Sequence, residues 1–292
     1  MKIQPECVPC LLKRIIFEAE LSSNDLAVKT KVLRNACMLL SELYDPQKCS
    51  ADIATKVHKL VYDTLQDTDP YDALKKESNT VALSLLPKVE ALIHNADDPL
   101  KTGMICSIIG NMMDFGIDGA SSDPSMLSKI FLKMYQKGLG YDDYPQVKEI
   151  LQNAKKVLLF TDNCGEIVFD KLLCRELKIL NPSLFVTLVV RGEPIISDAT
   201  LKDAKTLNFR EVVDEILTTG CFAIGVNFQR LPLKVGKRIK DSDLIICKGM
   251  ANYESFSETD YHPIVYLLRT KCHAIATSMK LPQNINAIKL FK

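Results

Sequence analysis

Residues 157–173, VLLFTDNCGEIVFDKLL, join a short apolar run to an amphipathic stretch through a polar break. The break contributes two carboxylic acids and one amide, from Asp162, Glu166 and Asn163. A further acid, Asp198, lies in a second polar segment of the chain. Carboxylate and amide oxygens are hard ligands that suit Mg²⁺ or Mn²⁺. Asp162, Asn163 and Asp198 are therefore the predicted ligands of a divalent cation.

Two basic residues extend this pattern toward phosphate chemistry. Arg191 follows the apolar run 184–190, and Lys248 follows the run 244–247. A cation, two basic side chains and a helix N-terminus opened by Gly165 would together form a site for a phosphate dianion. The metal could also lower the pKa of an attacking water. The residue types predict phosphate-ester hydrolysis.

Three short apolar runs must position these side chains: 157–160, 184–190 and 244–247. Each is too short for a typical helix, and helical patterns separate them. Such runs are typical of parallel strands covered on both faces, in an α/β sheet of the doubly wound type. Ligands of open parallel sheets bind beyond the carboxyl ends of the strands, which is where the polar residues occur.

The N-terminal half has a different periodicity. Up to about Asp114, apolar residues recur every three or four positions, as in Leu11, Leu12, Ile15, Ile16 and Ala19, which predicts a helix bundle. Residues 138–145, GLGYDDYP, resemble a linker. We therefore expect a helical domain over 1–145 and a Rossmann-like α/β domain over 146–292.

Composition limits the classes of partner. The 292 residues are 47% apolar, and 37 Lys and Arg nearly balance 36 Asp and Glu, so bulk charge offers no footprint for nucleic acid or an anionic membrane. The N-terminus lacks an apolar signal core, and no run approaches the roughly 18 residues of a transmembrane helix. We expect a cytoplasmic protein whose ten cysteines are mainly reduced and buried.

Several blocks, in order, resemble one family. TDNCGEIVFD, VVRGEPIISDAT and CKGMANYESF are similar to the DNAGE, RG-P-NDAT and KG-x-x-NYE blocks of the damage-control phosphatases, also catalogued as domain of unknown function eighty-nine. PECVPCLLKR and IIGNMMDFG resemble the archaeal and bacterial subfamily that carries a CxxC near its start. The resemblance spans the whole chain.

The resemblance implies a helical portion joined to a Rossmann-like portion, and a metal-dependent phosphatase acting on a small phosphorylated metabolite, such as a sugar phosphate or a damaged metabolite. The implied cofactor is a divalent ion: Mn²⁺, Ni²⁺, Co²⁺ or Mg²⁺. The family motifs place the metal on Asp162, Asn163 and Asp198, catalysis on Asp162, Glu166 and Lys248, and substrate binding on Asn111, Asp114, Arg191 and Asn252. Cys164, Ser197 and the pair Met250-Ala251 depart from the family pattern.

Other interpretations remain open. Cys7 and Cys10 have the spacing of a zinc or redox pair, but a zinc site needs two more ligands, which Cys37, Cys49, Cys106 or His58 would have to supply. The simpler interpretation is that Cys7 and Cys10 are structural cysteines at the start of a helix. The four histidines match no catalytic motif. The alternatives to a phosphatase are an S-adenosylmethionine-dependent carboxyl methyltransferase and a thiol or metal sensor built on Cys7 and Cys10.

Overall fold

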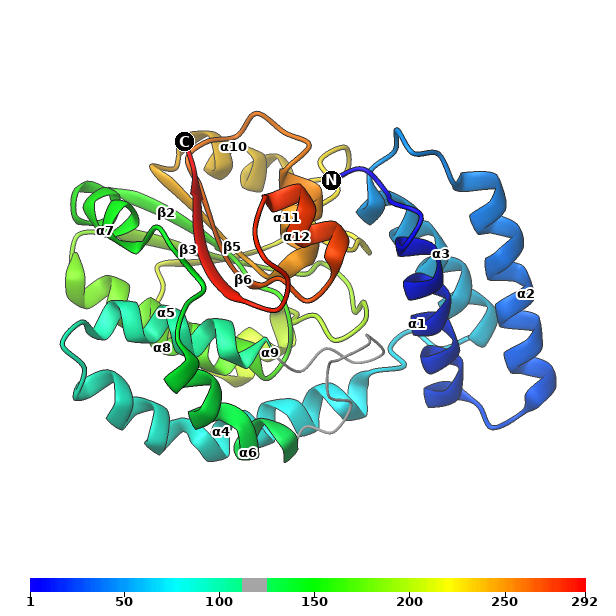
Figure 1. The fold of residues 1–292 in the computed structure, drawn as a ribbon, viewed down its shortest axis with the longest axis horizontal. Coiled ribbons are helices and arrows are strands. Elements are labelled where there is room, and N and C mark those ends of the chain that lie inside the picture. Colours follow the sequence, from blue (N-terminus) through cyan, green and yellow to red (C-terminus); the bar gives the residue numbers. More distant parts are fainter. Residues whose placement is uncertain (112–124) are drawn as a thin grey trace.

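The computed structural model describes residues 1–111 and 125–292, and Figure 1 shows a lobe of helices beside an α/β body. The lobe consists of α1 (Cys7–Ser22), α2 (Leu26–Leu43) and α3 (Ser50–Leu65). The chain then continues beneath the sheet as α4 (Asp72–His94), α5 (Pro99–Gly110) and α6 (Ser125–Lys137).

The helices of the lobe follow the apolar spacing of the sequence. Helix α1 buries Leu11, Ile15 and Ala19, which are four residues apart and therefore share one face. Helix α2 begins after Asp25, whose side chain accepts a hydrogen bond of 2.7 Å from the Ala27 amide. This cap satisfies one of the amide groups left unpaired at a helix start.

The described residues form one seven-stranded sheet in the order β1-β7-β6-β5-β2-β3-β4. Only the β6–β7 pair is antiparallel. The strands are β1 (Tyr141–Asp142), β2 (Lys156–Phe160), β3 (Phe185–Val190), β4 (Glu215–Thr218), β5 (Leu244–Lys248), β6 (Ile264–Arg269) and β7 (Asn286–Phe291). The three predicted runs are confirmed as β2, β3 and β5, and they lie side by side at the centre of the sheet.

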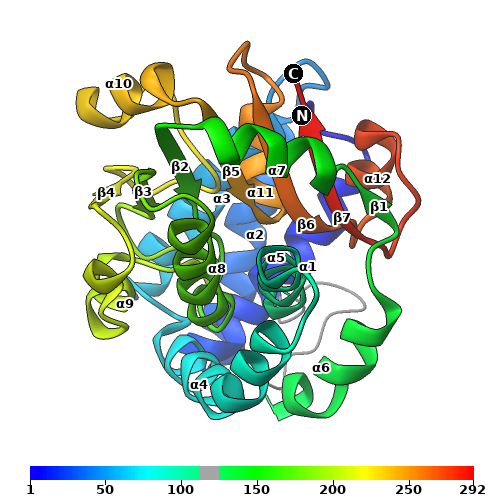
Figure 2. The same cartoon turned by 90° about the vertical axis from the view of Figure 1, so that its left-hand side faces the viewer.

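Both faces of the central strands are buried, as their continuous apolar sequences predict. In β2, Val157 and Leu159 join the core on one face, whereas Leu158 and Phe160 join the core on the other. Helices α5 and α8 (Glu166–Leu180) cover the first face. The second is covered by α10 (Leu233–Asp241), α11 (Gly249–Phe256) and α12 (His273–Met279), as Figure 2 shows. The predicted three-layer α/β architecture is confirmed.

The remaining elements are α7 (Tyr144–Asn153), α9 (Leu201–Thr206) and the short 3₁₀ helix η1 (Phe209–Glu211). Helices α4 and α5 pack on α8, and β1 pairs with β7 of the sheet. The lobe of α1–α3 stands apart from this body in Figure 1 and meets it where α3 contacts α11. The domain division at residue 145 stays a prediction.

Within 1–111 and 125–292, no helix combines the length and the apolar character that crossing a bilayer requires.

Candidate active site

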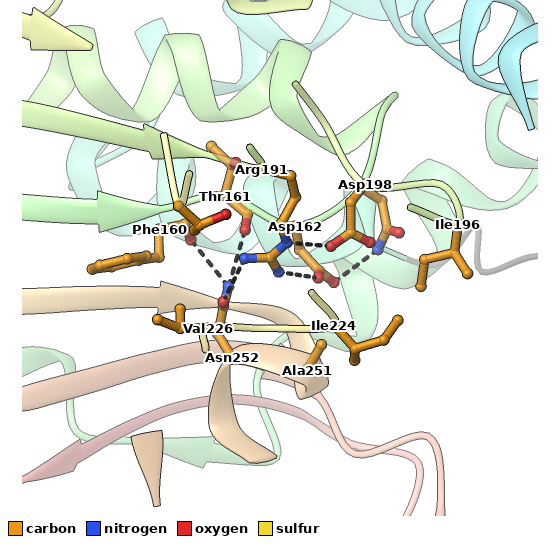
Figure 3. A network of polar contacts seen from close by, with 12 residues as sticks. Phe160, Thr161, Asp162, Arg191, Ile196, Asp198, Ile224, Val226, Ala251 and Asn252 are labelled. Carbon is orange, nitrogen blue, oxygen red and sulfur yellow. Dashed lines mark hydrogen bonds and ion pairs between the residues drawn. The ribbon is translucent and has the colours of Figure 1, made fainter. Parts of the chain in front are cut away.

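Three neighbouring strands deliver the predicted residues to one edge of the sheet. Asp162 and Asn163 follow β2, Arg191 follows β3, and Lys248 is the last residue of β5. Because β2 runs parallel to both β3 and β5, the carboxyl ends of all three point the same way (Figure 3). The loop after Arg191 brings Asp198 back to the same edge, where it forms an isolated backbone bridge with Asn163.

The guanidinium of Arg191 joins the two aspartates in Figure 3. Its Nε donates a hydrogen bond to Asp198 Oδ2, and its Nη2 lies 3.6 Å from Asp162 Oδ1. Nη2 is buried and makes no hydrogen bond within the described residues. A buried donor left without an acceptor is costly, so this nitrogen favours an anionic ligand beside it.

Asn163 is fixed between the two aspartates. Its Nδ2 donates to Asp162 Oδ2 at 2.8 Å, and its Oδ1 accepts a hydrogen bond of 2.5 Å from Ser197 Oγ. Ser197, one of the predicted departures from the family pattern, thus binds a residue of the predicted metal set through its hydroxyl.

Asn252 supports the arginine from α11. Its Oδ1 accepts from Arg191 Nη1 at 3.0 Å, while its Nδ2 donates to the carbonyl oxygens of Lys248 and Thr161 at 2.7 and 2.9 Å. The amide therefore connects the ends of β2 and β5 to Arg191, and it orients the guanidinium rather than facing open space.

Asn111, which follows α5, reaches the site from the helical half. Its Nδ2 donates to Asp162 Oδ2 at 2.8 Å and also binds Glu166 Oε2. The predicted partner of Asn111, Asp114, lies outside the described residues.

Glu166 and Lys248 lie below the aspartates in a closed cluster of charge, with both side chains 0% exposed. The Lys248 ammonium group binds Glu166, Asp170 Oδ1 at 3.0 Å and the Ser107 carbonyl oxygen at 3.1 Å. Ser107 Oγ also donates to Asp170 Oδ1 at 2.5 Å. The cluster thus holds two carboxylates around one cation.

Burial sets the pKa values in this cluster. Desolvation raises the pKa of the Glu166 and Asp170 carboxyls above their ordinary values, and the charge of Lys248 offsets only part of this effect. Desolvation alone would lower the pKa of Lys248, but the nearby Asp170 and Glu166 carboxylates outweigh it and raise that pKa. Lys248 is therefore held as a cation.

A cavity of about 150 Å³ opens above the aspartates, between the lobe and the strand ends. Its floor includes Asp162, Asn163, Asp198, Met250 and Ala251. Its roof includes Cys7, Leu11 and Arg14 from α1 and Ser50, Ala54 and His58 from α3. Of the residues predicted for the phosphatase site and lying within the described ranges, only Asp162, Asn163 and Asp198 line this cavity.

Two groups were not predicted for the phosphate site: Asp170, and His58, which the sequence offered only as a possible zinc ligand beside Cys7 and Cys10. His58 lines the cavity although its surrounding sequence matches no motif, and its partner Glu18 is on another helix. The sequence could have predicted Asp170, because it follows Glu166 by four residues on α8 and therefore lies on the same face of the helix.

The thiols of Cys7 and Cys10 also line the cavity, together with Cys272, which precedes α12. Desolvation raises the pKa of Cys7 to about 11 and that of Cys272 to about 12. Thiols held in their protonated form are poor nucleophiles. Within the described residues, no group of three or more His, Cys, Asp or Glu side chains is arranged to hold a metal ion.

The two helix N-termini near the site differ in what they offer an anion. At α8, the amides of Gly165 and Cys164 donate to Asn79 Oδ1 and the Ser197 carbonyl oxygen at 2.7 and 2.8 Å. At α11, no side chain caps the first turn, and Met250 and Ala251 line the cavity. Of these two helix N-termini, that of α11 is the one whose first-turn residues border the cavity.

Gly249 permits this approach of α11. Its φ is 71°, and a Cβ added there would lie 1.9 Å from Asp162 Oδ2. Only glycine combines this backbone conformation with such close contact to the carboxylate.

The oxygen-bearing side chains on the floor fit a divalent cation in chemical type. Two carboxylates and an amide are the donors that Mg²⁺ and Mn²⁺ accept, and Asp162, Asn163 and Asp198 all border the cavity. Because Asn163 is the third member, Asp162, Asn163 and Asp198 do not form a group of three His, Cys, Asp or Glu side chains.

The fold and site define an α/β protein with an acidic, arginine-supported pocket at the carboxyl ends of the parallel strands of a mostly parallel sheet, and with a helical lobe above it. The sequence profile described as the damage-control phosphatase ARMT1-like domain matches residues 3–285. The chain belongs to this family.

Similar proteins cover the chain almost completely. A protein named damage-control phosphatase from Archaeoglobus fulgidus is 40% identical over 276 residues, which are 94% of each chain. A damage-control phosphatase from Pyrococcus horikoshii is 28% identical over 97% of this chain and 96% of its own. A crystal structure of a DUF89 family protein from Pyrococcus horikoshii covers 100% of both chains with a TM-score of 0.90 at 26% identity.

Proposed function

We propose that this protein is a divalent-metal-dependent phosphatase that hydrolyses small phosphorylated metabolites, within the subfamily that carries CxxC near its start. The observation that carries the proposal is the pair Asp162 and Asp198, bordering the cavity and bound to the single guanidinium of Arg191. Membership of the damage-control phosphatase family supports the reaction class.

Asp162, Asn163 and Asp198 would hold the metal. When bound, the ion would lower the pKa of a water and offset phosphoryl charge. Mn²⁺, Ni²⁺, Co²⁺ and Mg²⁺ are the candidate ions.

The chain's own residues bind and orient the phosphate. We propose that Arg191 contacts a phosphate oxygen through Nη2, which makes no hydrogen bond within the described residues, although the side chain lies behind the residues that line the cavity. Asn252 keeps the guanidinium in place. The first turn of α11 adds backbone amides next to Asp162.

Glu166 and Lys248 are proposed to act in catalysis from beneath the floor. Asn111 connects Glu166 to Asp162 by hydrogen bonds, so the charge of the buried cluster bears directly on the orientation of that carboxylate. Preorganised groups of this kind stabilise a transition state without having to reorganise during the reaction.

The test is a screen of sugar phosphates and other phosphometabolites with each candidate metal, measuring phosphate release. We expect release that requires a divalent ion and stops on chelation. Metal-independent hydrolysis would contradict the metal role. Methyl transfer from S-adenosylmethionine without phosphate release would contradict the phosphatase and favour the methyltransferase alternative.

A further inference from the structure

A buried acid–imidazole pair joins α1 to α3 at the roof of the cavity. His58 Nδ1 lies 2.7 and 2.9 Å from the two carboxylate oxygens of Glu18. His58 is 1% exposed and Glu18 is 0% exposed. The Tyr71 hydroxyl also donates to Glu18 at 3.5 Å. These contacts fix the orientation of the imidazole ring.

Because Glu18 holds Nδ1, the orientation of the second ring nitrogen, Nε2, is also fixed. Glu18 occupies Nδ1, and no hydrogen bond of His58 Nε2 is found among the described residues. His58 lines the same cavity as Asp162 and Asp198. Ser50 and Ala54, which precede it on α3 at intervals of four residues, line that cavity too, so this face of α3 is its roof.

Two hydrogen bonds fix α3 relative to the floor. The Tyr62 hydroxyl, one turn beyond His58, accepts from the Ile196 amide at 2.9 Å, two residues before Asp198. Thr55 Oγ1 accepts from the Ile224 amide at 2.9 Å. Because Ile196 and Ile224 both line the cavity, the roof is attached directly to the loops that form its walls.

We propose that His58 is the general acid that protonates the leaving group of the phosphate ester, an inference that rests on the proposed phosphatase activity. The imidazolium carries a proton on each nitrogen, one directed to Glu18 and one to the substrate. When water attacks phosphorus, its oxygen forms the new P–O bond and one of its protons passes to solvent, while the P–O ester bond breaks and its electron pair stays on the ester oxygen. That oxygen takes the proton from Nε2, leaving neutral imidazole, which regains a proton from water before the next turnover.

The position of His58 opposite the aspartates matches this role. The floor binds the phosphoryl group, so the ester oxygen of a substrate in this small cavity extends toward the roof. A carboxylate that orients the imidazole is also the arrangement that proton-transferring histidines require. A pair that served only to join two helices would contribute little, because desolvation offsets most of the attraction in buried ion pairs.

The experiment compares two leaving groups in the full-length protein loaded with its best metal. Para-nitrophenolate leaves as a stable anion and needs no proton, whereas the alkoxide of an alkyl phosphate needs one. We expect His58→Gln to lower kcat/KM for the best alkyl phosphate by about a hundredfold or more, the usual size of general-acid catalysis, and to leave para-nitrophenyl phosphate hydrolysis within about threefold.

Glu18→Gln provides a second variant of similar shape that loses only the charge facing Nδ1. We expect the same selective loss at smaller size, and this variant carries the test if His58→Gln does not fold. Equal losses on both substrates, or no loss on either, would overturn the proposal by making the pair structural or idle. A wild-type protein that hydrolyses neither phosphate would instead overturn the proposed function itself, and the inference with it.

Discussion

The carboxylates at the strand ends fall into two regions that differ in access. Asp162 and Asp198 border the cavity and share the guanidinium of Arg191. Glu166 and Asp170 lie underneath, fully buried around Lys248. Both regions pair two acids with one base, so residue type does not separate them. Exposure to the cavity does, and it is the basis on which we propose ligand binding for the first region and support for the second.

The matched exchange of one acid in each region has the largest expected effect. Asp162→Asn removes a charge that faces the cavity, and Asp170→Asn removes one that does not. We expect Asp162→Asn to reduce kcat/KM by more than about a hundredfold, since even residues behind a metal ligand contribute 10–100-fold. Asp170→Asn should stay within about tenfold. Steady-state kinetics at saturating metal measures both, and equal losses would erase the distinction between the regions.

A substitution in the buried region should lower the stability of the protein. Lys248→Met keeps the length of the side chain but leaves Glu166 and Asp170 without their cation. We expect the free energy of unfolding to fall by about 3–5 kcal/mol, because an uncompensated charge remains buried. Urea denaturation measures it. If Lys248→Met lost kcat but kept its stability, Lys248 would be a phosphate contact during turnover, and the distinction between the two regions would fail.

The sequence predicted the first region better than the second. Short apolar runs that Asp162, Arg191 and Lys248 follow indicate parallel strands, and parallel strands gather their carboxyl ends at one edge. The burial of Lys248 could not be inferred in this way, because it depends on α5 supplying Ser107 from far along the chain.

The roof was beyond sequence reasoning for the same reason. The pairing of His58 with Glu18 depends on how α1 packs against α3. Helical periodicity gives the faces of the two helices but not their register against each other. The spacing of Cys7 and Cys10 predicted a possible thiol or metal site on α1. The structure shows that α1 also supplies Leu11 and Arg14 to the cavity.

A glycine pair tests how closely the floor is fitted. Gly249→Ala would place a Cβ 1.9 Å from Asp162 Oδ2 at a φ of 71°. We expect a stability loss of about 1–3 kcal/mol and a clear fall in kcat as Asp162 is displaced. The control is Gly236→Ala in α10, where nothing lies within 4 Å and alanine should stabilise the helix by about 0.5–1 kcal/mol. Equal effects of the two exchanges on kcat would contradict a fitted floor.

The smallest expected effect is a pH dependence that belongs to the buried region alone. The pKa of Asp170 is raised in the folded protein by desolvation, so the native state keeps a proton that the unfolded chain has already released. Between the ordinary carboxyl pKa and the raised one, the native state binds more protons, and the stability from Asp170 is therefore lost as pH rises through that window.

Asp170→Asn removes this contribution. We expect the stability of the wild type relative to Asp170→Asn to decrease as pH increases above the ordinary range of aspartate. Urea denaturation of both proteins across a pH series measures the difference. A difference that grows with pH would mean that Lys248 outweighs burial at Asp170, and the buried region would then be an ordinary stabilising ion pair rather than a cluster with one acid in excess.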